Sequence, residues 1–519
     1  MKMRTLLATA AALALGAGAA HADFTLTILH TNDVHDRFEP VTSSGSSCGA
    51  EDDAAGKCFG GVARLVTATR EAREAAVNPV VLDGGDWFQG TLFYTRYKHA
   101  AAAEFIDRIG YDAMAVGNHE LDDGPEELAA LADAVDTPLL AANMDTSSEP
   151  LLTGKIAAHV VLEVGGEKIG VIGLTPQDND ELASPGPNLT FSAPAPAVQA
   201  EVDELTGQGI DKIILLSHSG YSVDQQIADQ THGVDVIVGG HSHTLLGTGE
   251  GAAGPYPTMV NGVPIVQAEA YSMYLGELVV TFDDDGRVIA ADGAPKLLDA
   301  SVAEDPEAAA RVAELAGPLE EIRARQIGET EAAIEGDRDV CRQRECSMGN
   351  LVAEAQLARV ADQGVQISLV NGGGLRASID AGPVTMGEVL TVLPFNNTLS
   401  TFQITGAQLK EALENGVSQM ADGGGRFPQV AGMRYTVDPA APVGQRVSEV
   451  MVGDQPLDMA AEYMAVSNNY VRNGGDGYDS FVDAKNAYDF GPDLADVVAE
   501  YLSAHQPYTP FTDGRITVK

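Results

Sequence analysis

The first half of the chain repeats one pattern, in which a short run of apolar and β-branched residues stops abruptly at a cluster of polar residues. Amphipathic segments with helical spacing lie between these runs, for example at residues 62–75 and 126–134. Strands that are buried on both faces of a sheet read as continuous apolar runs, so this alternation predicts an α/β domain with a largely buried sheet. The predicted strands are residues 24–29, 80–82, 113–116, 168–174, 213–216 and 234–238.

The middle of the chain predicts a division into two domains. Residues 305–329 are rich in Ala and Glu, and their apolar residues fall on one helical stripe that Gly317-Pro318 interrupts, which indicates a linker helix. An α+β pattern follows, with strands expected at residues 365–370, 398–404 and 463–466 and a helix at residues 406–414. The expected domains are therefore residues 23–304 and 330–519, joined by a linker helix at residues 305–329.

Residues 1–22 have the features of a cleaved export signal. Lys2 and Arg4 precede an apolar stretch at residues 6–19, which ends in the small-x-small sequence Ala20-His21-Ala22. The rest of the chain has no apolar stretch long enough to span a bilayer, and its C-terminal residues lack a hydrophobic anchor tail. The expected product is a periplasmic or secreted protein without a membrane anchor.

The four cysteines form two close pairs, Cys48 with Cys58 and Cys341 with Cys346. In an oxidising compartment such pairs predict two local disulfide bonds. Zinc binding by all four thiolates is the alternative, but neither pair has the spacing of a zinc finger and a long stretch of chain separates the pairs.

Acidic residues outnumber basic residues by 75 to 31, which gives the chain a formal net charge of −44. Such a field repels nucleic acids and anionic lipid surfaces, so a polynucleotide or membrane-surface partner is not expected. A small anionic substrate is compatible with this charge if metal ions or arginines reverse it locally. The acidic run at residues 283–285 lacks the ligand spacing of a calcium-binding loop, and with Gly286 it predicts a hairpin turn.

The polar clusters that end the predicted strands are rich in potential metal ligands. Because strand ends of an open α/β sheet converge on one crevice, side chains far apart in the sequence can meet there. Imidazole and carboxylate ligands without thiolate suit zinc, manganese or iron, and a shared carboxylate can hold two cations about 3.5 to 4 Å apart. A single histidine of this kind is more often a surface or core residue, but a succession of such clusters favours a metal site. The candidate ligands are Asp33, His35, Asp86, Asn118, His218, His241 and His243, and His119 lies beside Asn118.

With these clusters the sequence resembles the 5'-nucleotidase family, whose catalytic domain is a calcineurin-like metallophosphoesterase. The resemblance covers essentially the whole chain after residue 22, and it implies an N-terminal α/β sandwich, a linker helix and a C-terminal α+β nucleotide-binding domain. It also implies that His119 stabilises the transition state or assists the leaving oxygen, and that Asp122 orients His119. Some members have Gln or Asn at the position of His243, which leaves the metal preference open. The implied ligands are Asp33, His35 and His243 for one metal and Asn118, His218 and His241 for the other, with Asp86 bridging.

The second half of the chain contains motifs that resemble the nucleotide-binding motifs of the ecto-5'-nucleotidase branch, in which both cysteine pairs also recur. These motifs are residues 341–346, 371–376, 393–395 and 473–477. The resemblance implies that Phe395 and Tyr470 sandwich the base, and that the ribose and phosphate are held by Asp476, Arg342, Arg376 and Asn371. The family more often has Phe at the position of Tyr470. Without this context the Asn-Gly sequences predict plain turns, the two aromatic residues predict core packing, and Arg344 and Glu345 are interpreted as surface residues.

The resemblance therefore implies an exported 5'-nucleotidase that hydrolyses nucleoside 5'-monophosphates such as AMP by a two-metal, metal-hydroxide mechanism. Zinc is the first expectation for the two divalent ions, with manganese, cobalt and iron as alternatives. The resemblance also implies that the second domain carries the nucleoside to the metals by a large rotation. A second hypothesis is hydrolysis of UDP-sugars, dinucleotides or cyclic nucleotides at the same metals. A third, a non-catalytic binding protein, is disfavoured because every candidate ligand position is present, and the sequence leaves the oligomeric state open.

Overall fold

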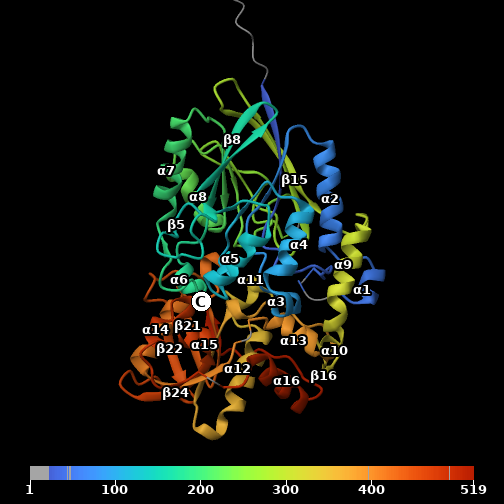
Figure 1. Cartoon of the computed structure of the whole chain (residues 1–519). Coiled ribbons are helices and arrows are strands. Elements are labelled where there is room, and N and C mark those ends of the chain that lie inside the picture. The colour runs from blue at the N-terminus through green and yellow to red at the C-terminus, as the bar shows by residue number, and fades with distance from the viewer. Residues whose placement is uncertain (1–22, 44, 46–47, 250, 396, 490) are drawn as a thin grey trace, which may run out of the picture.

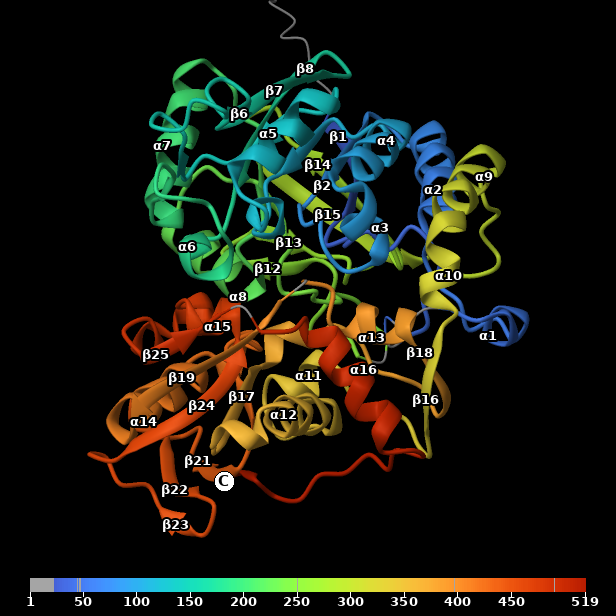
Figure 2. The same ribbon diagram turned by 60° about the horizontal axis from the view of Figure 1, so that its bottom comes forward.

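The computed structural model describes residues 23–43, 45, 48–249, 251–395, 397–489 and 491–519, and the predicted export signal at residues 1–22 lies outside them. The described chain folds into two domains, which Figures 1 and 2 show one above the other. Within the described residues, no helix has the length and the apolar character that crossing a membrane requires. The predicted fold class, an α/β sandwich followed by an α+β domain, is confirmed.

The first domain contains two large β-sheets and a two-stranded one, formed by β5 (Met144–Asp145) and β9 (Thr190–Phe191), whereas the apolar runs alone predicted one sheet. That prediction was wrong because a continuous apolar run shows that a strand is buried but not which sheet it joins. The first sheet has the strand order β15 (Val288–Leu297), β14 (Tyr274–Phe282), β1 (Phe24–Thr31), β2 (Pro79–Asp83), β3 (Ala113–Ala115), β4 (Leu139–Leu140) and β6 (Ile156–Ala157). The second has the order β12 (Thr258–Val260), β13 (Val263–Val266), β11 (Val236–Val238), β10 (Ile213–Ser217), β8 (Glu167–Leu174) and β7 (His159–Val164).

The two sheets pack face to face, and helices cover their outer faces. Alternate residues of β1 point to opposite sides, so Leu26 and Ile28 enter the layer between the sheets while Leu29 packs against the helices. Leu82 of β2 and Leu216 of β10 fill the same inner layer. The covering helices are α2 (Val62–Ala75), α4 (His99–Ile109) and α9 (Pro306–Ala316) on the first sheet, and α7 (Pro194–Gly207) and α8 (Tyr221–Gln230) on the second (Figure 2).

The hairpin of β14 and β15 was not among the predicted strands, although its turn was. Oδ1 of Asp283 accepts hydrogen bonds from the N–H groups of Asp285 and Arg287, both at 2.9 Å, and Gly286 has a φ of 77°. This geometry confirms the predicted hairpin turn. β15 lies at the edge of its sheet and alternates exposed with half-buried residues, so it lacks the apolar run that marked the other strands.

The linker helix packs on the first domain. Oδ1 of Asp305 caps α9, and Ala308, Val312 and Leu315 of α9 join the core beneath α2. The helix is interrupted at Gly317-Pro318, as predicted, and the short α10 (Glu320–Arg323) follows. The next strand, β16 (Gln326–Thr330), pairs with β18 (Gly382–Thr385) of the second domain. The chain therefore crosses between the domains just after α10.

The second domain is built on a sheet with helices on both faces. Leu369 and Val370 of β17 point to opposite cores, one beneath α14 (Gly406–Gly416) and the other beneath α12 (Ser347–Arg359) and α16 (Leu494–Ala504). This sheet has the order β20 (Pro428–Ala431), β17 (Ile367–Asn371), β24 (Glu462–Asn468), β19 (Leu399–Thr405) and β25 (Lys485–Tyr488). A smaller sheet beside it has the order β23 (Gln455–Pro456), β22 (Val447–Val452), β21 (Met433–Val437) and β26 (Ile516–Val518).

Both predicted disulfide bonds are present, between Cys48 and Cys58 and between Cys341 and Cys346. The alternative, a zinc site of four thiolates, is wrong because these bonds leave no free cysteine in the described chain. Each bond lies within one domain, in agreement with the two-domain organisation.

Asp235, a half-buried residue just before β11, should make stability depend on pH. Burial raises the pKa of its carboxyl from 3.8 to about 7, against the hydrogen bond from the N–H of Ile213. The folded state therefore binds more protons than the unfolded state between about pH 4 and pH 7, and stability falls as the pH rises through that range. Asp235→Asn keeps the acceptor and removes the charge, so it should raise the melting temperature at pH 8 but not near pH 4.

Thermal unfolding of the variant and the parent at both pH values measures this difference. Asp284→Asn, in the exposed turn after β14, is the matched control and should leave the melting temperature unchanged at either pH. An equal gain for Asp235→Asn at pH 4 and pH 8 would contradict the assignment.

Candidate active site

The candidate metal ligands lie in the loops that follow five parallel strands of the first domain. Asp33 and His35 follow β1, Asp86 follows β2, and Asn118 follows β3. From the second sheet, His218 follows β10, and His241 and His243 follow β11. Because the two sheets pack with these strand ends together, the structure brings all seven predicted ligands to one place, with Asn118 joined to the others through His241.

The ligand atoms form two groups. In the first group, Nε2 of His243 lies 3.2 Å from Oδ1 of Asp33 and 3.1 Å from Nε2 of His35. In the second group, Nε2 of His218 lies 3.0 Å from Oδ2 of Asp86. That Asp86 oxygen is also 3.8 Å from Nε2 of His35, so Asp86 lies between the groups. The second group is completed by His241, whose Nδ1 is 2.9 Å from Oδ1 of Asn118.

Five of these ligands have left-handed backbone conformations. The φ angles are 53° at Asp33 and His35, 60° at Asp86, 68° at His241 and 52° at His243. Non-glycine residues seldom adopt such angles, and those that do gather at functional sites where the surrounding structure enforces them. The loops are therefore shaped to aim these side chains inward.

Hydrogen bonds behind the ligands fix their orientation. Nδ1 of His35 lies 3.0 Å from the carbonyl oxygen of Phe88, and Nδ1 of His218 lies 2.5 Å from the carbonyl oxygen of Gly84. Because an Nδ1–H that donates to a carbonyl leaves Nε2 with a free lone pair, both rings present a ligand atom to the centre.

Glu120 holds the loop that carries Asp86. Its carboxylate accepts hydrogen bonds from the N–H groups of Asp86 at 3.0 Å and of Trp87 and Gly117 at 2.7 Å. A Cβ atom at Gly117 would lie 2.2 Å from Oδ1 of Asp86, so only glycine fits there. Glu120 was not among the predicted site residues, because nothing in its sequence position distinguishes it from an exposed acidic neighbour of His119.

The electrostatics of the cluster fit divalent cations. Burial lowers the pKa values of His35, His241 and His243 well below the ordinary range, so these rings are neutral and can act as ligands. Burial raises the pKa of Asp33 to about 6, and its Oδ1 has no hydrogen-bond partner among the described residues. A buried carboxylate oxygen without a donor, surrounded by imidazole nitrogens, is the environment that a bound cation completes.

His119 lies beside the two ligand groups and is held by carboxylates. Its backbone N–H donates to Oδ1 of Asp86 at 2.9 Å, and its Nδ1 is 2.6 Å from Oδ2 of Asp122. Burial alone lowers the pKa of His119, but the charges of Asp122 and Asp86 outweigh it and raise the pKa overall. Protonated His119 is therefore stabilised, as a residue that donates to a leaving oxygen requires.

A cavity of about 800 Å³ joins this cluster to the second domain. Nη2 of Arg376 reaches across to 3.2 Å from Nε2 of His35, and the ring of Phe395 stacks on His119 with centroids 5.6 Å apart. The cavity lining includes all six residues predicted to bind nucleotide, namely Arg342, Asn371, Arg376, Phe395, Tyr470 and Asp476.

Asn371, Tyr470 and Asp476 form one hydrogen-bonded unit at this wall. Nδ2 of Asn371 donates to Oδ2 of Asp476 at 2.6 Å, and the Tyr470 hydroxyl donates to Oδ1 of Asp476 at 3.2 Å. Asp476 is 5% exposed and has a left-handed φ of 57°. The loops at residues 371–376 and 473–477 are therefore parts of one cavity wall, which goes beyond the plain turns that their Asn-Gly sequences predict.

Arg338 is a cavity residue that the sequence analysis missed. It lies on the short helix α11 (Arg338–Cys341), one turn before Arg342, so both guanidinium groups line the same cavity. Nη1 of Arg338 and Nε of Arg342 are buried without a hydrogen-bond partner among the described residues. The i, i+4 spacing of these arginines could have identified the pair. Guanidinium N–H groups that lack a partner at a cavity wall favour an anionic ligand.

Comparisons with known proteins agree with this architecture. A family model described as calcineurin-like phosphoesterase matches residues 26–245, and one described as 5'-nucleotidase, C-terminal domain, matches residues 326–483. A 5'-nucleotidase of Diplobatis ommata is 40% identical over 98% of this chain and 92% of its own length. A human 5'-nucleotidase is 39% identical over 98% of this chain and 93% of its own length. A 5'-nucleotidase precursor of Thermus thermophilus has a crystal structure that matches with a TM-score of 0.91 and 42% identity, over 95% of this chain and 99% of that one.

The first domain, with its cluster of candidate histidine and aspartate ligands, defines a metal-dependent phosphoesterase. Nearly the whole chain matches curated 5'-nucleotidases in both domains. The chain belongs to the 5'-nucleotidase family.

Proposed function

We propose that this protein hydrolyses nucleoside 5'-monophosphates such as AMP to nucleoside and phosphate. The observation that carries the proposal is the cavity between the domains, which is lined by the candidate metal centre of the first domain and by arginines, aromatic rings and an acidic hydrogen-bonding unit of the second domain. A nucleotide has matching groups, since it combines a phosphate, a ribose and a base.

Two divalent cations are proposed to bind at the ligand groups. Asp33, His35 and His243 would hold one ion, Asn118, His218 and His241 the other, and Asp86 would bridge them. Bound there, the ions supply an activated water nucleophile and neutralise charge on the phosphoryl oxygens. Neutral imidazoles with carboxylates favour zinc, with manganese, cobalt and iron as alternatives.

Around the phosphoryl group, the residues of this chain bind charge and supply a proton. Arg342 and Arg376 would hold phosphate oxygens through their guanidinium N–H groups, which counters the acidic charge of the whole protein. Nε2 of His119 would stabilise the transition state or protonate the leaving ribose oxygen, while Asp122 holds Nδ1 and keeps the ring oriented.

The nucleoside would bind between Phe395 and Tyr470, with Asp476 accepting from the ribose hydroxyls and Asn371 fixing Asp476. Because His119 stacks on Phe395, a base would use the opposite face of this ring. Stacking recognises any base, which predicts broad base specificity.

The same metals could in principle cleave UDP-sugars, dinucleotides or cyclic nucleotides. The comparisons favour the monoesterase, because the curated relatives that cover this chain are named 5'-nucleotidases. Phosphate release from a panel of AMP, cyclic AMP, UDP-glucose and NAD separates these activities, and AMP should be the best substrate.

We also propose that the protein is exported and that residues 1–22 are its export signal. We further propose the domain limits 23–304 and 330–519, with residues 305–329 as the linker between them.

Phe395 and Tyr470, called here the aromatic clamp, provide the test of the proposed nucleoside-binding site. Phe395→Ala or Tyr470→Ala should remove about 1 to 3 kcal/mol of binding, which corresponds to a loss of roughly 5- to over 100-fold for AMP, mostly in KM. Hydrolysis of p-nitrophenyl phosphate, whose small ring uses the clamp poorly, should change far less. Steady-state kinetics on both substrates measures the difference. Equal losses on the two substrates would show that the rings serve core packing rather than base binding.

A further inference from the structure

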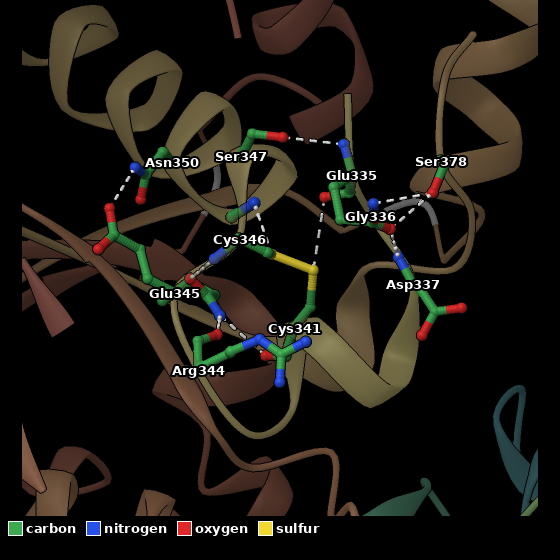
Figure 3. Close-up of a disulfide and its surroundings, with 12 residues drawn as sticks. Glu335, Gly336, Asp337, Cys341, Arg344, Glu345, Cys346, Ser347, Asn350 and Ser378 are labelled. Carbon is green, nitrogen blue, oxygen red and sulfur yellow. Dashed lines mark hydrogen bonds between the residues drawn. A yellow bond between two sulfur atoms is a disulfide. The ribbon is translucent and has the colours of Figure 1, made fainter. Parts of the chain in front are cut away.

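Arg342 lies in a loop that the Cys341–Cys346 disulfide closes into a ring, called here the disulfide ring and comprising residues 341–346. Figure 3 shows this ring between α11 and the first turn of α12. The disulfide joins the two ends of the ring to each other. It does not join the ring to the sheet that carries Asn371, so another contact must set the position of Arg342 relative to that sheet.

Gln429 supplies this contact. Its side chain is fully buried, and Nε2 donates to the carbonyl oxygens of Cys341 at 2.8 Å and of Arg344 at 2.7 Å. Its Oε1 accepts from the N–H of Cys346 at 3.2 Å. A glutamine amide offers two N–H donors and one carbonyl oxygen, so every polar group of this side chain binds the disulfide ring. One residue thus holds both ends and the middle of the ring.

The backbone of Gln429 belongs to the sheet that carries the nucleotide residues. Gln429 lies opposite Val370 in the pairing of β20 with β17, and Pro428 lies opposite Asn371. The ring also packs tightly on this sheet, because a Cβ atom at Gly372 would lie 2.7 Å from the carbonyl oxygen of Cys341. On the other side, a Cβ atom at Gly349 would lie 2.4 Å from Cγ of Gln429. The glutamine side chain therefore occupies a space that only a glycine at position 349 leaves open.

A second anchor holds the outer side of the ring. Glu345, which the sequence pattern placed at the surface, is half-buried and accepts hydrogen bonds from Nδ2 of Asn350 at 2.8 Å and from the N–H groups of Asp513 at 2.8 Å and Gly514 at 2.9 Å. This anchor ties the ring to the C-terminal segment, away from the cavity. Gln429 is the anchor on the side of Asn371.

The side chain of Arg342 is buried but makes few hydrogen bonds of its own. It is 7% exposed, its Nη1 donates to the carbonyl of Gly423 at 3.3 Å, and its Nε has no hydrogen-bond partner among the described residues. The position of the guanidinium group therefore follows the position of the backbone that carries it. Since the contacts of Gln429 set that backbone against the sheet, they also set the distance between Arg342 and Asn371.

We propose that Gln429 is a positioning residue that holds Arg342 in place for the anionic part of the substrate. This inference rests on the nucleotide-binding role proposed above for Arg342. Gln429 contacts the backbone of the ring rather than the cavity, and Arg342 is the ring residue that lines the cavity, so the proposed effect on hydrolysis passes through Arg342.

A double-mutant cycle on the metal-loaded full-length enzyme tests this route. Gln429→Met keeps the bulk of the side chain and removes its three hydrogen bonds. It should lower kcat/KM for AMP by about 10- to 100-fold, because a small displacement of a substrate-binding group can reduce the rate by such a factor. In an Arg342→Ala background the same change should cost less than about 2-fold, since the residue it positions is gone. The matched control is Gln356→Met. Gln356 is also fully buried, in α12, and it bonds only Ser368 among the described residues, so its replacement should leave kcat/KM unchanged.

Equal losses from Gln429→Met in the two backgrounds would overturn the inference, because they would mark a general structural role. If Gln429→Met does not fold, Gln429→Asn, which keeps the amide and shortens its reach, enters the same cycle with the same expectation. If Arg342→Ala leaves AMP hydrolysis unchanged, the proposed role of Arg342 fails. If Arg342→Ala weakens AMP hydrolysis and Gln429→Met does not, only the positioning role fails.

Discussion

Replacing Asp86 with Ala is expected to lower kcat/KM for AMP by about 1,000-fold or more, a larger loss than at any other candidate ligand. Oδ2 of Asp86 lies 3.0 Å from Nε2 of His218 and 3.8 Å from Nε2 of His35, so one carboxylate serves both ligand groups. Its Oδ1 also accepts from the backbone N–H of His119. The change should therefore disturb both proposed metal positions and the proposed catalytic histidine together, and elemental analysis should show that bound metal is lost. Exhaustive chelation of the unmodified enzyme should likewise abolish hydrolysis.

Asp83→Asn is the matched control for Asp86→Ala. Asp83 is equally buried at the end of β2, but its carboxylate bonds Thr31 and the N–H of Gly85 and belongs to neither ligand group. Asp83→Asn should lower kcat/KM for AMP far less than Asp86→Ala does, and it should leave the metal content near normal. Trp87, the single tryptophan of the chain, follows Asp86 directly, so its fluorescence offers an independent record of metal binding. Full activity in metal-free protein would refute the two-metal proposal.

The sequence identified the strands that position the site because their physical signal is local. A strand buried on both faces needs a continuous apolar run, and a loop that carries polar ligands must interrupt it, as Asp33 and His35 do after β1. Val62–Ala75, predicted as a helix from its amphipathic spacing, is the helix α2 within the same limits. The convergence of the strand ends followed from the general geometry of α/β sheets.

The division of those strands between two sheets could not be read from the same signal. Ile28 and Ile214 are equally apolar and both fill the layer between the sheets, yet they belong to different sheets. Only the pairing of backbone groups, which depends on residues distant in sequence, separates them.

Residues whose side chains bind backbone groups of other residues were also not predicted. Glu120 and Gln429 matter through hydrogen bonds to N–H and carbonyl groups, and such partners carry no sequence signature. The contact between Phe395 and His119 joins two domains and depends on how the domains pack, which no local pattern specifies.

Kinetics should distinguish His119, the proposed catalytic histidine, from the proposed metal ligands. His119→Ala is expected to lower kcat by about 10²- to 10⁴-fold, the usual contribution of a general acid, while both metals stay bound. Asp122→Asn preserves the shape of the partner and removes its charge. Because Asp122 is the larger of the two charges that raise the pKa of His119, this change should lower that pKa. A His119 that acts in its protonated form then loses its proton at lower pH, so the alkaline limb of the kcat profile should move to lower pH.

The pH profile decides between this role and a merely structural one. If Asp122 only braced the loop, Asp122→Asn would lower kcat by the same factor at every pH, and the limb would stay in place. A limb that stays in place in Asp122→Asn but disappears in His119→Ala would mean that His119 titrates without the influence of Asp122, against their 2.6 Å contact. A substrate with a much better leaving group, p-nitrophenyl phosphate, needs less proton donation, so its loss in His119→Ala should be smaller than the loss for AMP. Equal losses on both substrates would assign His119 to charge stabilisation at the phosphoryl group rather than to the leaving oxygen.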